Sequence, residues 1–211
     1  MTRIFCLAWD ESVHQNAPAG QQSASKTRMW ASDDFFKTRR IVDLGLGRDA
    51  RGFMGLGASR RYLITALQDP TQGRGKELSL YVSLDAETWS KAQFPHGQLL
   101  HESAYTILDG PQFHLLVDVL DAASNTGSLF MSDSSGTQFG LSLHGTQRNA
   151  MGIVDYEHLA NIDGVAIANI RTEAALARVK TKVTHDEGSH WTYLAAPRTD
   201  VDGHSIGCNT A

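Results

Sequence analysis

Short apolar runs separated by polar turn residues form the main pattern along this chain. The runs are six to nine residues long, are rich in Val, Ile, Leu, Phe and Tyr, and are divided by Gly, Asp, Asn, Ser or Pro. Runs of this length and composition predict β-strands. The expected strands cover residues 4–9, 61–68, 77–84, 112–120, 127–132, 164–170 and 178–184. The stretch TEAALARVK at 172–180 has helical character, and we expect at most one helical turn there before a strand. The pattern therefore predicts an all-β chain.

A repeated feature divides the chain into four similar parts. In each part a strand ends in Ser or Thr, a short polar turn follows, and an aromatic residue comes next. The hydroxyl residues are Ser32, Ser83, Ser132 and Thr184. They recur about 50 residues apart, a period typical of the blades of a β-propeller, and each interval has room for the four strands of one blade. In the second interval we expect strands at 53–57, 61–68, 77–83 and 88–94.

The period also predicts the domain boundaries. We expect blades at residues 1–47, 48–97, 98–146 and 147–197, followed by a polar, turn-rich tail at 198–211. The first blade lacks its innermost strand in this interpretation, because the run IFCLAW near the start reads as a second strand. The tail is too polar to supply the missing strand and close a ring. The sequence therefore predicts an open arc of about four blades rather than a closed propeller.

The fourth copy of the repeat is the most complete. Its sequence, THDEGSHW, fits the Asp-box pattern Ser/Thr-x-Asp-x-Gly-x-x-Trp, with Thr184, Asp186, Gly188 and Trp191 at the defining positions. The hydroxyl and the carboxylate can accept hydrogen bonds from N–H groups of a turn. Gly can adopt a positive φ, and Trp can bury its ring between sheets. We interpret the box as a structural turn rather than a reaction centre.

The other three copies are degenerate in ways that a repeated turn tolerates. The second keeps the hydroxyl, the acid and the ring but has a shorter turn. The third exchanges Asp for Ser and Trp for Phe, and the first has two acids and two aromatic residues but no Gly. The residues assigned to these boxes are Ser83, Asp85 and Trp89; Ser132, Ser134, Gly136 and Phe139; and Ser32 and Asp34.

Candidate chemistry outside the boxes is weak. His185 and His190 have the spacing of no zinc signature, so we predict no metal site. The Gly-rich run at 44–59 lacks the Lys-Ser/Thr of a phosphate-binding loop and the helix that would follow it, so we expect no cofactor. The chain has no GxSxG sequence, and we expect no catalytic residue. Arg60 and Arg61 are interpreted as a solvated strand end rather than an anion site.

Composition and charge narrow the classes of function. The chain has 211 residues, of which 41% are hydrophobic and 20% charged, and a formal net charge of −4. These values are typical of a soluble globular protein and give no electrostatic reason to expect a nucleic-acid or anionic-membrane partner. We expect neither an export signal nor a membrane-spanning segment, because the apolar runs are too short. Cys6 and Cys208 lie at opposite ends of the chain, and their pairing state stays open.

The segment 129–170 carries a resemblance to a known family. The runs LFMSDSSGTQFGLSL, then RN and VDYE, then IDGVAIANI resemble the propeller of the sortilin family, which includes the vacuolar protein sorting receptors of fungi. The similarity extends from about Trp30 to Pro197. It implies a non-enzymatic type I membrane receptor that acts in the Golgi and endosome lumen. The receptor's ten-bladed propeller would capture protein or peptide cargo for transport to the vacuole.

The resemblance also implies where cargo binds and where this chain departs from the family. Four boxes account for about four of ten blades, so the remaining blades are missing, and we expect the isolated arc to aggregate or to need a partner. Cys208 resembles the first cysteine of the cysteine-rich module that follows the family's last blade. Leu78 occupies the position of an arginine that can hold a peptide carboxylate in sortilin-type pockets. The matching cargo-contact candidates are Ile64, Leu80, Ser90, Tyr105 and Ile107.

Two alternatives remain beside the receptor segment. Asp boxes also occur in sialidase-like glycoside hydrolases, but that chemistry needs several arginines to clamp a carboxylate, a Tyr/Glu nucleophile pair and an acid. None of the five tyrosines lies in a sequence setting of that kind. The other alternative is a truncated duplicate without an independent function.

Overall fold

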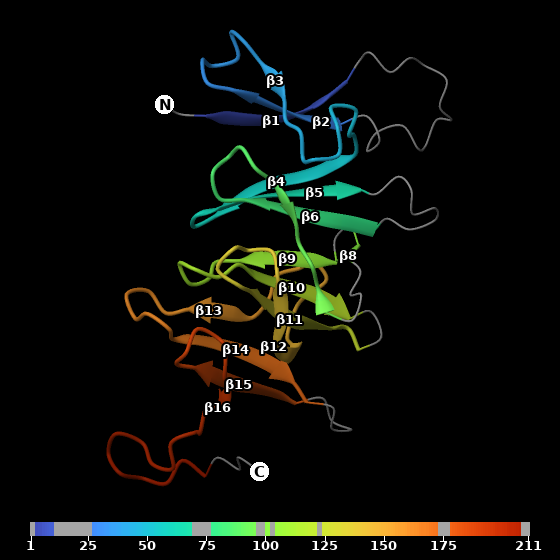
Figure 1. The fold of residues 1–211 in the computed structure, drawn as a ribbon. Helices are drawn as coiled ribbons and strands as arrows, with labels where there is room; N and C mark the ends of the chain where they lie inside the picture. The colour runs from blue at the N-terminus through green and yellow to red at the C-terminus, as the bar shows by residue number, and fades with distance from the viewer. Residues whose placement is uncertain are drawn as a thin grey trace.

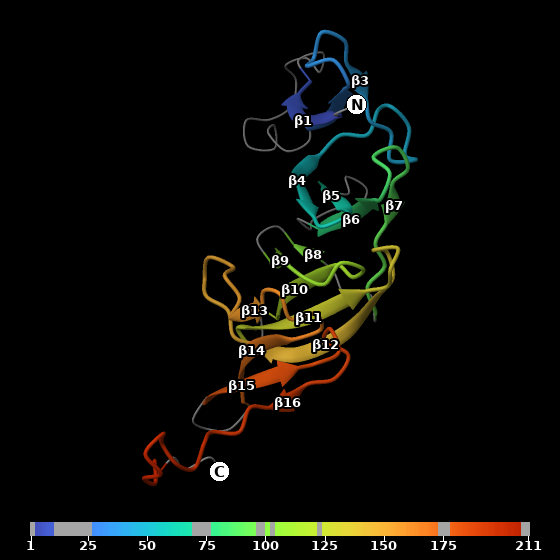
Figure 2. The same cartoon turned by 90° about the vertical axis from the view of Figure 1, so that its left-hand side faces the viewer.

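The computed structural model of the chain describes an all-β fold. The described residues are 3–10, 27–68, 77–95, 100–101, 104–121, 124–172 and 178–207. Their strands pair antiparallel throughout and form three hydrogen-bonded sheets. The sheets follow one another in chain order from the N-terminal to the C-terminal end of the molecule (Figure 1), and a view turned by 90° shows the same order (Figure 2).

The first two sheets are each a short antiparallel meander. The first contains β1 (Ile4–Trp9), β2 (Thr27–Ser32) and β3 (Arg40–Ile41). The second contains β4 (Phe53–Ser59), β5 (Tyr62–Gln68), β6 (Glu77–Ser83) and β7 (Ser90–Lys91). A further short strand, β8 (Leu100–His101), pairs with the first two residues of β6. The order β4-β5-β6-β7 follows the sequence without a crossover.

The third sheet joins two further meanders. The first of these contains β9 (Tyr105–Leu108), β10 (Leu116–Asp121), β11 (Thr126–Ser132) and β12 (Phe139–Thr146). The second contains β13 (Tyr156–His158), β14 (Ala166–Arg171), β15 (Val179–Thr184) and β16 (Thr192–Tyr193). One residue pair, Thr146 with Ile170, links β12 to β14 and makes the two meanders one sheet.

The apolar pattern predicted the long strands well and the short ones less well. The expected strands at 61–68, 77–84, 127–132, 164–170 and 178–184 correspond to β5, β6, β11, β14 and β15. The expected strand at 112–120 begins later, at Leu116, because Gln112 and Phe113 form a turn. The strand expected at 88–94 is reduced to Ser90–Lys91. The helical turn expected within 172–180 falls largely on residues 173–177, which lie outside the described residues.

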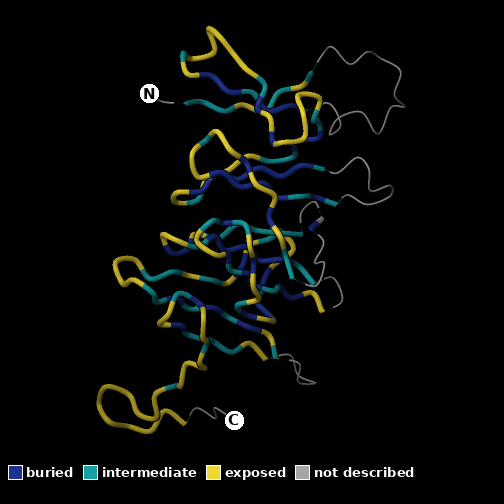
Figure 3. The backbone as a smooth tube through the Cα atoms, viewed as in Figure 1, coloured by how far each residue is buried: buried dark blue, intermediate teal, exposed yellow. Residues whose placement is uncertain are grey.

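Alternating side chains of the strands build the cores between neighbouring sheets. In β6, Leu78, Leu80 and Val82 point into one hydrophobic cluster, whereas Tyr81 points into another on the opposite face. Successive side chains of a strand face opposite sides of its sheet, so a strand with both faces apolar lies between two cores. The buried segments accordingly lie inside the stack, and the exposed ones lie mainly at its turns and along the C-terminal tail (Figure 3).

Each core joins two neighbouring meanders. One cluster includes Met29, Val42, Phe53 and Trp89 and joins the first sheet to the second. A larger cluster, with Ile64, Leu80, Val117 and Phe130 among its members, joins the second sheet to the third. The third cluster includes Leu129, Leu143, Ala168 and Ile170 and packs the last two meanders together. In the described part of the chain, no helix is long and apolar enough to cross a membrane.

Candidate functional site

The Asp-box turn of the last meander is a closed network of hydrogen bonds. The Thr184 hydroxyl donates to Asp186 (2.8 Å) and accepts from the Gly188 amide (2.9 Å). Asp186 accepts the His190 amide (2.8 Å) and lies 2.6 Å from the His190 ring nitrogen Nδ1. These bonds stabilise the carboxylate and lower the pKa of Asp186 to about 2. The acid and His190 are thus occupied within the turn itself.

Trp191 completes this turn by contacting the neighbouring meander. Its indole N–H lies 3.0 Å from the Ser142 hydroxyl on β12, and the Ser142 hydroxyl donates to the Gly188 carbonyl (2.6 Å). The ring also packs against the third hydrophobic cluster. The aromatic residue therefore attaches the turn to the preceding meander.

The first turn forms the same network although Phe36 stands where the fourth has Gly188. The Ser32 hydroxyl donates to Asp34 (2.8 Å) and accepts from the Phe36 amide (2.8 Å), and Asp34 accepts the Thr38 amide (2.9 Å). Phe35 and Phe36 have φ values of 58° and 62°, close to 61° at Glu187, whereas Gly188 has 97°. The first and fourth turns thus each have two consecutive left-handed residues, and of these two turns only the fourth has glycine at the second position.

The second turn is one residue shorter but keeps the hydroxyl and the acid in the same roles. The Ser83 hydroxyl donates to Asp85 (3.0 Å), and Asp85 accepts the amides of Glu87 and Thr88 (both 2.8 Å). These bonds, together with one from the Thr88 hydroxyl, hold the pKa of Asp85 far below its usual range. Trp89 is buried and contacts Phe5 of β1 edge to face, with 6.1 Å between the ring centroids.

The third turn corrects one assignment made from the sequence. Ser134 was expected in the position of the acid, but the carboxylate that accepts the turn amides belongs to Asp133, which receives bonds from Thr137 and Gln138 (both 3.2 Å). The tight turn begins at Asp133, whose carbonyl accepts the Gly136 amide, so the acid lies one residue earlier than in the other copies. Ser134 contributes its carbonyl, which accepts the Tyr62 hydroxyl (3.1 Å).

Gly136 and Phe139 of this third turn lie where the Asp-box pattern needs them. Gly136 has φ +77°, and a Cβ there would lie 2.8 Å from the Tyr62 ring. Phe139 is buried and stacks on Phe94, with 4.4 Å between the centroids. The third turn thus packs against the second sheet through both residues.

The five cargo-contact candidates divide between the core and the surface. Ile64 and Leu80 are only 2% and 1% exposed and belong to the cluster between the second and third sheets. Both side chains are buried together with Val117 and Phe130 of the third sheet in this cluster, so neither offers a ligand any surface in this structure. Tyr105 and Ile107 on β9 are half-buried against it, and Ser90 on β7 is exposed.

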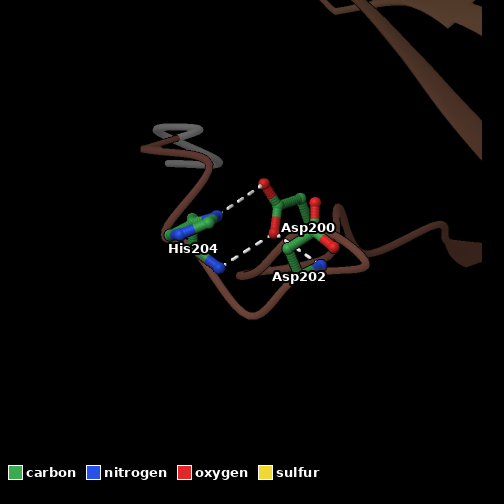
Figure 4. Close-up of side chains that lie close together, drawn as sticks. All are labelled: Asp200, Asp202 and His204. Atoms are coloured by element: carbon green, nitrogen blue, oxygen red, sulfur yellow. Dashed lines mark hydrogen bonds and ion pairs between the residues drawn. The ribbon is translucent and has the colours of Figure 1, made fainter.

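A cluster that the sequence reading did not predict lies in the tail. Asp200, Asp202 and His204 place one ligand atom each within 4.8 Å of one another, on an exposed turn (Figure 4). Asp200 already accepts the amides of Asp202 (3.0 Å) and His204 (2.8 Å), so it caps the turn in the manner of the Asp-box acids. The spacing Asp-x-Asp-x-His was the available signal in the sequence. These contacts account for the cluster as a capped turn.

A groove of about 620 Å³ crosses the turn edge of the last three meanders. The turn between the first two strands of each meander contributes to it: Arg60 and Arg61 from β4–β5, residues 110–113 from β9–β10, and His158, Asp163 and Gly164 from β13–β14. Glu187 of the last Asp box closes one side. Arg60 and Arg61, interpreted as a solvated strand end, therefore line a concave site. Three segments about 50 residues apart form this site, so no local pattern could have shown it.

Comparisons with known proteins identify the class to which this fold and these turns belong. The family model for Sortilin-Vps10, described as sortilin, neurotensin receptor 3, matches residues 2–211. The chain belongs to the Sortilin-Vps10 family, a family of vacuolar protein sorting receptors.

The relatives agree with this assignment. The chain is 48% identical, over 99% of its length, to a protein of Mycosarcoma maydis named vacuolar protein sorting/targeting protein 10. It is 40% identical, again over 99% of its length, to the protein of the same name from Laccaria bicolor. The chain spans only 14% and 15% of these two relatives.

Among solved structures, the β-propeller domain of the trilobed protease from Pyrococcus furiosus aligns with 82% of the chain and 50% of that domain, at a TM-score of 0.45 and 8% identity.

Proposed function

We propose that this chain is a cargo-binding propeller segment of a vacuolar protein sorting receptor. The observation that carries the proposal is the match to the Sortilin-Vps10 family along nearly the whole chain, with 48% identity to a fungal sorting protein. In this proposal the four meanders are blades of a larger, ten-bladed propeller, with boundaries near 1–47, 48–97, 98–146 and 147–197. The tail at 198–211 leads towards a cysteine-rich module.

The proposed place of action is the lumen of the Golgi and endosome. A receptor of this kind binds a soluble protein in one compartment and releases it in another, so its lumenal surface needs exposed grooves that can hold a peptide segment. The groove at the turn edge has that character. Three meanders line it, and its walls combine bare backbone, an aromatic ring and charged side chains.

The sialidase-like alternative is disfavoured at three of the five tyrosines by their environments. Burial raises the pKa of Tyr105 and Tyr156, and it raises that of Tyr62, whose hydroxyl is bonded to the Ser134 carbonyl. A tyrosine nucleophile needs the opposite, a neighbour that makes its phenolate accessible. Turnover of a fluorogenic sialoside above background would support the hydrolase and contradict the receptor.

A chimaeric receptor tests the proposal. The segment of the Mycosarcoma maydis protein that corresponds to this chain would be replaced by residues 1–211, and retention of a soluble vacuolar hydrolase would be compared with its secretion. We expect the chimaera to retain the hydrolase and a receptor with the segment deleted to secrete it. Secretion by a chimaera that is full-length and correctly located would overturn the proposal. It would favour the alternative of a duplicate without function.

The surface members of the predicted cargo-contact set can be tested in the same chimaera. Ser90, Tyr105 and Ile107 remain candidates because part of each side chain is accessible. Tyr105→Ala removes a ring that is half-buried against the core, so its melting temperature has to be measured beside its cargo retention. Unchanged retention by a folded Tyr105→Ala chimaera would remove this residue from the cargo site.

A further inference from the structure

The guanidinium of Arg61 is the feature of the turn-edge groove that points to a ligand. It lies 5.6 Å from the centroid of the Phe113 ring and 6.0 Å from that of Tyr62. Cation–π contacts of this kind use the flat face of the guanidinium and leave the N–H groups at its edge free to donate. Within the described part of the chain, no carboxylate is paired with Arg61.

The neighbouring Arg60 shows what a satisfied arginine looks like at the same turn. Its Nε and Nη2 donate to the two oxygens of Asp109 (3.0 and 3.2 Å), and Nε also donates to the Gly110 carbonyl (3.2 Å). Arg60 therefore fixes the β4–β5 turn against the β9–β10 turn. Arg61 has no such role, and it presents a fork of donors beside an aromatic ring that is about half exposed.

The walls of the groove are bare backbone at two points. A Cβ at Gly110 would lie 2.9 Å from Leu116, and a Cβ at Gly164, where φ is +79°, would lie 3.0 Å from the His185 carbonyl oxygen. Side chains are thus excluded at both positions, which fixes the course of these two turns; Gly110 is itself buried, and Gly164 leaves backbone partly accessible to a ligand. Two contacts hold the last turn in place: the Glu187 amide donates to the Gly164 carbonyl (3.0 Å), and His114 pairs with the Glu187 carboxylate (3.3 Å).

The charges around the groove limit what it can hold. Arg61 can bind a carboxylate with two parallel hydrogen bonds. Asp163 and Glu187 also line the groove, carry negative charge and would repel an acidic run. The groove is therefore suited to a single carboxylate that lies beside an apolar side chain, with the apolar group packed on Phe113.

We propose that the turn-edge groove binds an extended peptide segment of a cargo protein, with one Asp or Glu side chain on Arg61 and an adjacent aromatic side chain on Phe113. This inference rests on the proposed function, because it names the chemistry of the cargo segment. It places that segment at the turns of the last three meanders, away from the residues of β5, β6, β7 and β9 predicted from the family resemblance.

Peptide binding to the full 211-residue chain tests the inference. The probes are fluorescein-labelled GGFEGG, its neutral counterpart GGFQGG and a version with phosphoserine in place of Glu, all amidated at the C-terminus, and the readout is fluorescence anisotropy. We expect GGFEGG to bind about tenfold more tightly than GGFQGG, since only the acid can form the charge-assisted pair. Equal affinity for these two peptides would overturn the inference. Tight binding of the phosphopeptide alone, or displacement by low millimolar inorganic phosphate, would show a general anion site and would also overturn it.

Three variants assign the binding to the groove. Arg61→Gln should weaken GGFEGG about tenfold and abolish the preference for Glu over Gln, and Phe113→Ala should weaken both peptides. Arg39→Gln is the matched control, because Arg39 is also exposed and lies over an aromatic ring, 4.8 Å from Trp30, but is outside the groove. Arg61 and Phe113 are exposed, so all three variants should melt as the parent chain does. Undiminished affinity of a folded Arg61→Gln chain would refute the assignment.

The outcome separates this inference from the proposed function. If the chimaeric receptor retains the hydrolase and its Arg61→Gln version retains it equally well, the groove is not the cargo site although the segment binds cargo. If the chimaera fails while the peptides bind to the isolated chain with the expected preferences, the peptide groove exists and the sorting function is wrong.

Discussion

Single residues of the Asp-box turns show which positions the backbone controls. Phe36 has φ 62° in the position that Gly188 occupies in the fourth copy, where φ is 97°. A bulky residue with positive φ is strained, because its Cβ approaches the neighbouring carbonyl. The first turn nevertheless forms the bonds that the hydroxyl and the acid make in the fourth, so these two side chains, rather than glycine, maintain the turn.

This comparison predicts opposite effects of two substitutions. Phe36→Gly should raise the free energy of unfolding by about 1 kcal/mol, because it removes left-handed strain at an exposed side chain. Gly188→Ala should lower it by about 1 to 2 kcal/mol, since its Cβ would lie 3.0 Å from the Ser142 hydroxyl on top of the strain. Urea denaturation followed by circular dichroism measures both. A lower midpoint for Phe36→Gly would show that the Phe36 ring makes a stabilising contact that outweighs the strain.

Ionisation of the box acids predicts a loss of stability in acid. The pKa of Asp186 is about 2 in the folded chain, below the 3.8 of a free carboxyl. A depressed folded pKa contributes stability that is fully present above about pH 4 and is lost as the pH falls towards 2. The pKa of Asp34 is also lowered, mainly by its hydrogen bonds with the Thr38 amide and hydroxyl. Thermal melts should therefore show a melting temperature that these acids leave independent of pH between pH 5 and 7, and a steep fall of that temperature below pH 4.

The matched variant for this prediction is Asp186→Asn, which keeps the size of the side chain but does not ionise. Its melting temperature should lie below that of the parent at pH 6, and the difference should shrink as the pH approaches 2. A constant difference across that range would mean that the charge of Asp186 adds nothing to the turn.

At the scale of elements, a buried ion pair fixes the third meander to the segment that follows it. Asp118 on β10 is fully buried and accepts hydrogen bonds from the Arg148 guanidinium (2.8 Å) and from the Thr146 hydroxyl. Burial raises the pKa of Asp118, and the bonds from Thr146 and Arg148 oppose this rise. A Cβ at Gly127 would collide with the same carboxylate, so glycine there keeps the space for the pair.

Removing one partner of this pair should be more damaging than removing both. Arg148→Met leaves the Asp118 carboxylate buried without its cation and should destabilise the chain by about 3 to 5 kcal/mol. Asp118→Leu combined with Arg148→Met should recover part of that loss, because the remaining groups are apolar and similar in size. A double-mutant cycle in urea measures the coupling. Strictly additive effects would show that the two residues act independently.

The same scale shows what the sequence could and could not predict. Short apolar runs bounded by turn residues located β5, β6, β11, β14 and β15, because a strand packed into a core leaves a local pattern of this kind. In the third box the role of the acid was assigned to Ser134 instead of Asp133, since side-chain spacing does not reveal where a tight turn begins. The groove was missed because Arg61, Phe113 and His158 approach one another only after three meanders have stacked.

At the scale of the whole molecule, the last meander leaves an apolar outer face. Val179 and Leu194 are each more than half exposed and lie on β15 and directly after β16, and Tyr193 of β16 is exposed on the opposite face of this sheet. Lys180 and Lys182 lie over the Tyr193 ring, at 5.4 and 4.9 Å from its centroid. At the other end of the stack, Trp9 of β1 is also exposed. Sheet faces and edges of this kind associate with other sheets when they meet one.

We therefore expect the isolated chain to self-associate as its concentration rises, through these outer faces. Val179→Thr combined with Leu194→Ser should shift the association to higher concentrations, since it removes apolar area from the last face without touching any core cluster. Met151→Ser is the control, because Met151 is even more accessible than Val179 and Leu194 but lies on a turn before β13. Sedimentation velocity across a hundredfold range of concentration measures the effect. A single compact species with a constant sedimentation coefficient for the parent chain would contradict the prediction and would mean that these exposed faces are stable in water without a neighbouring sheet.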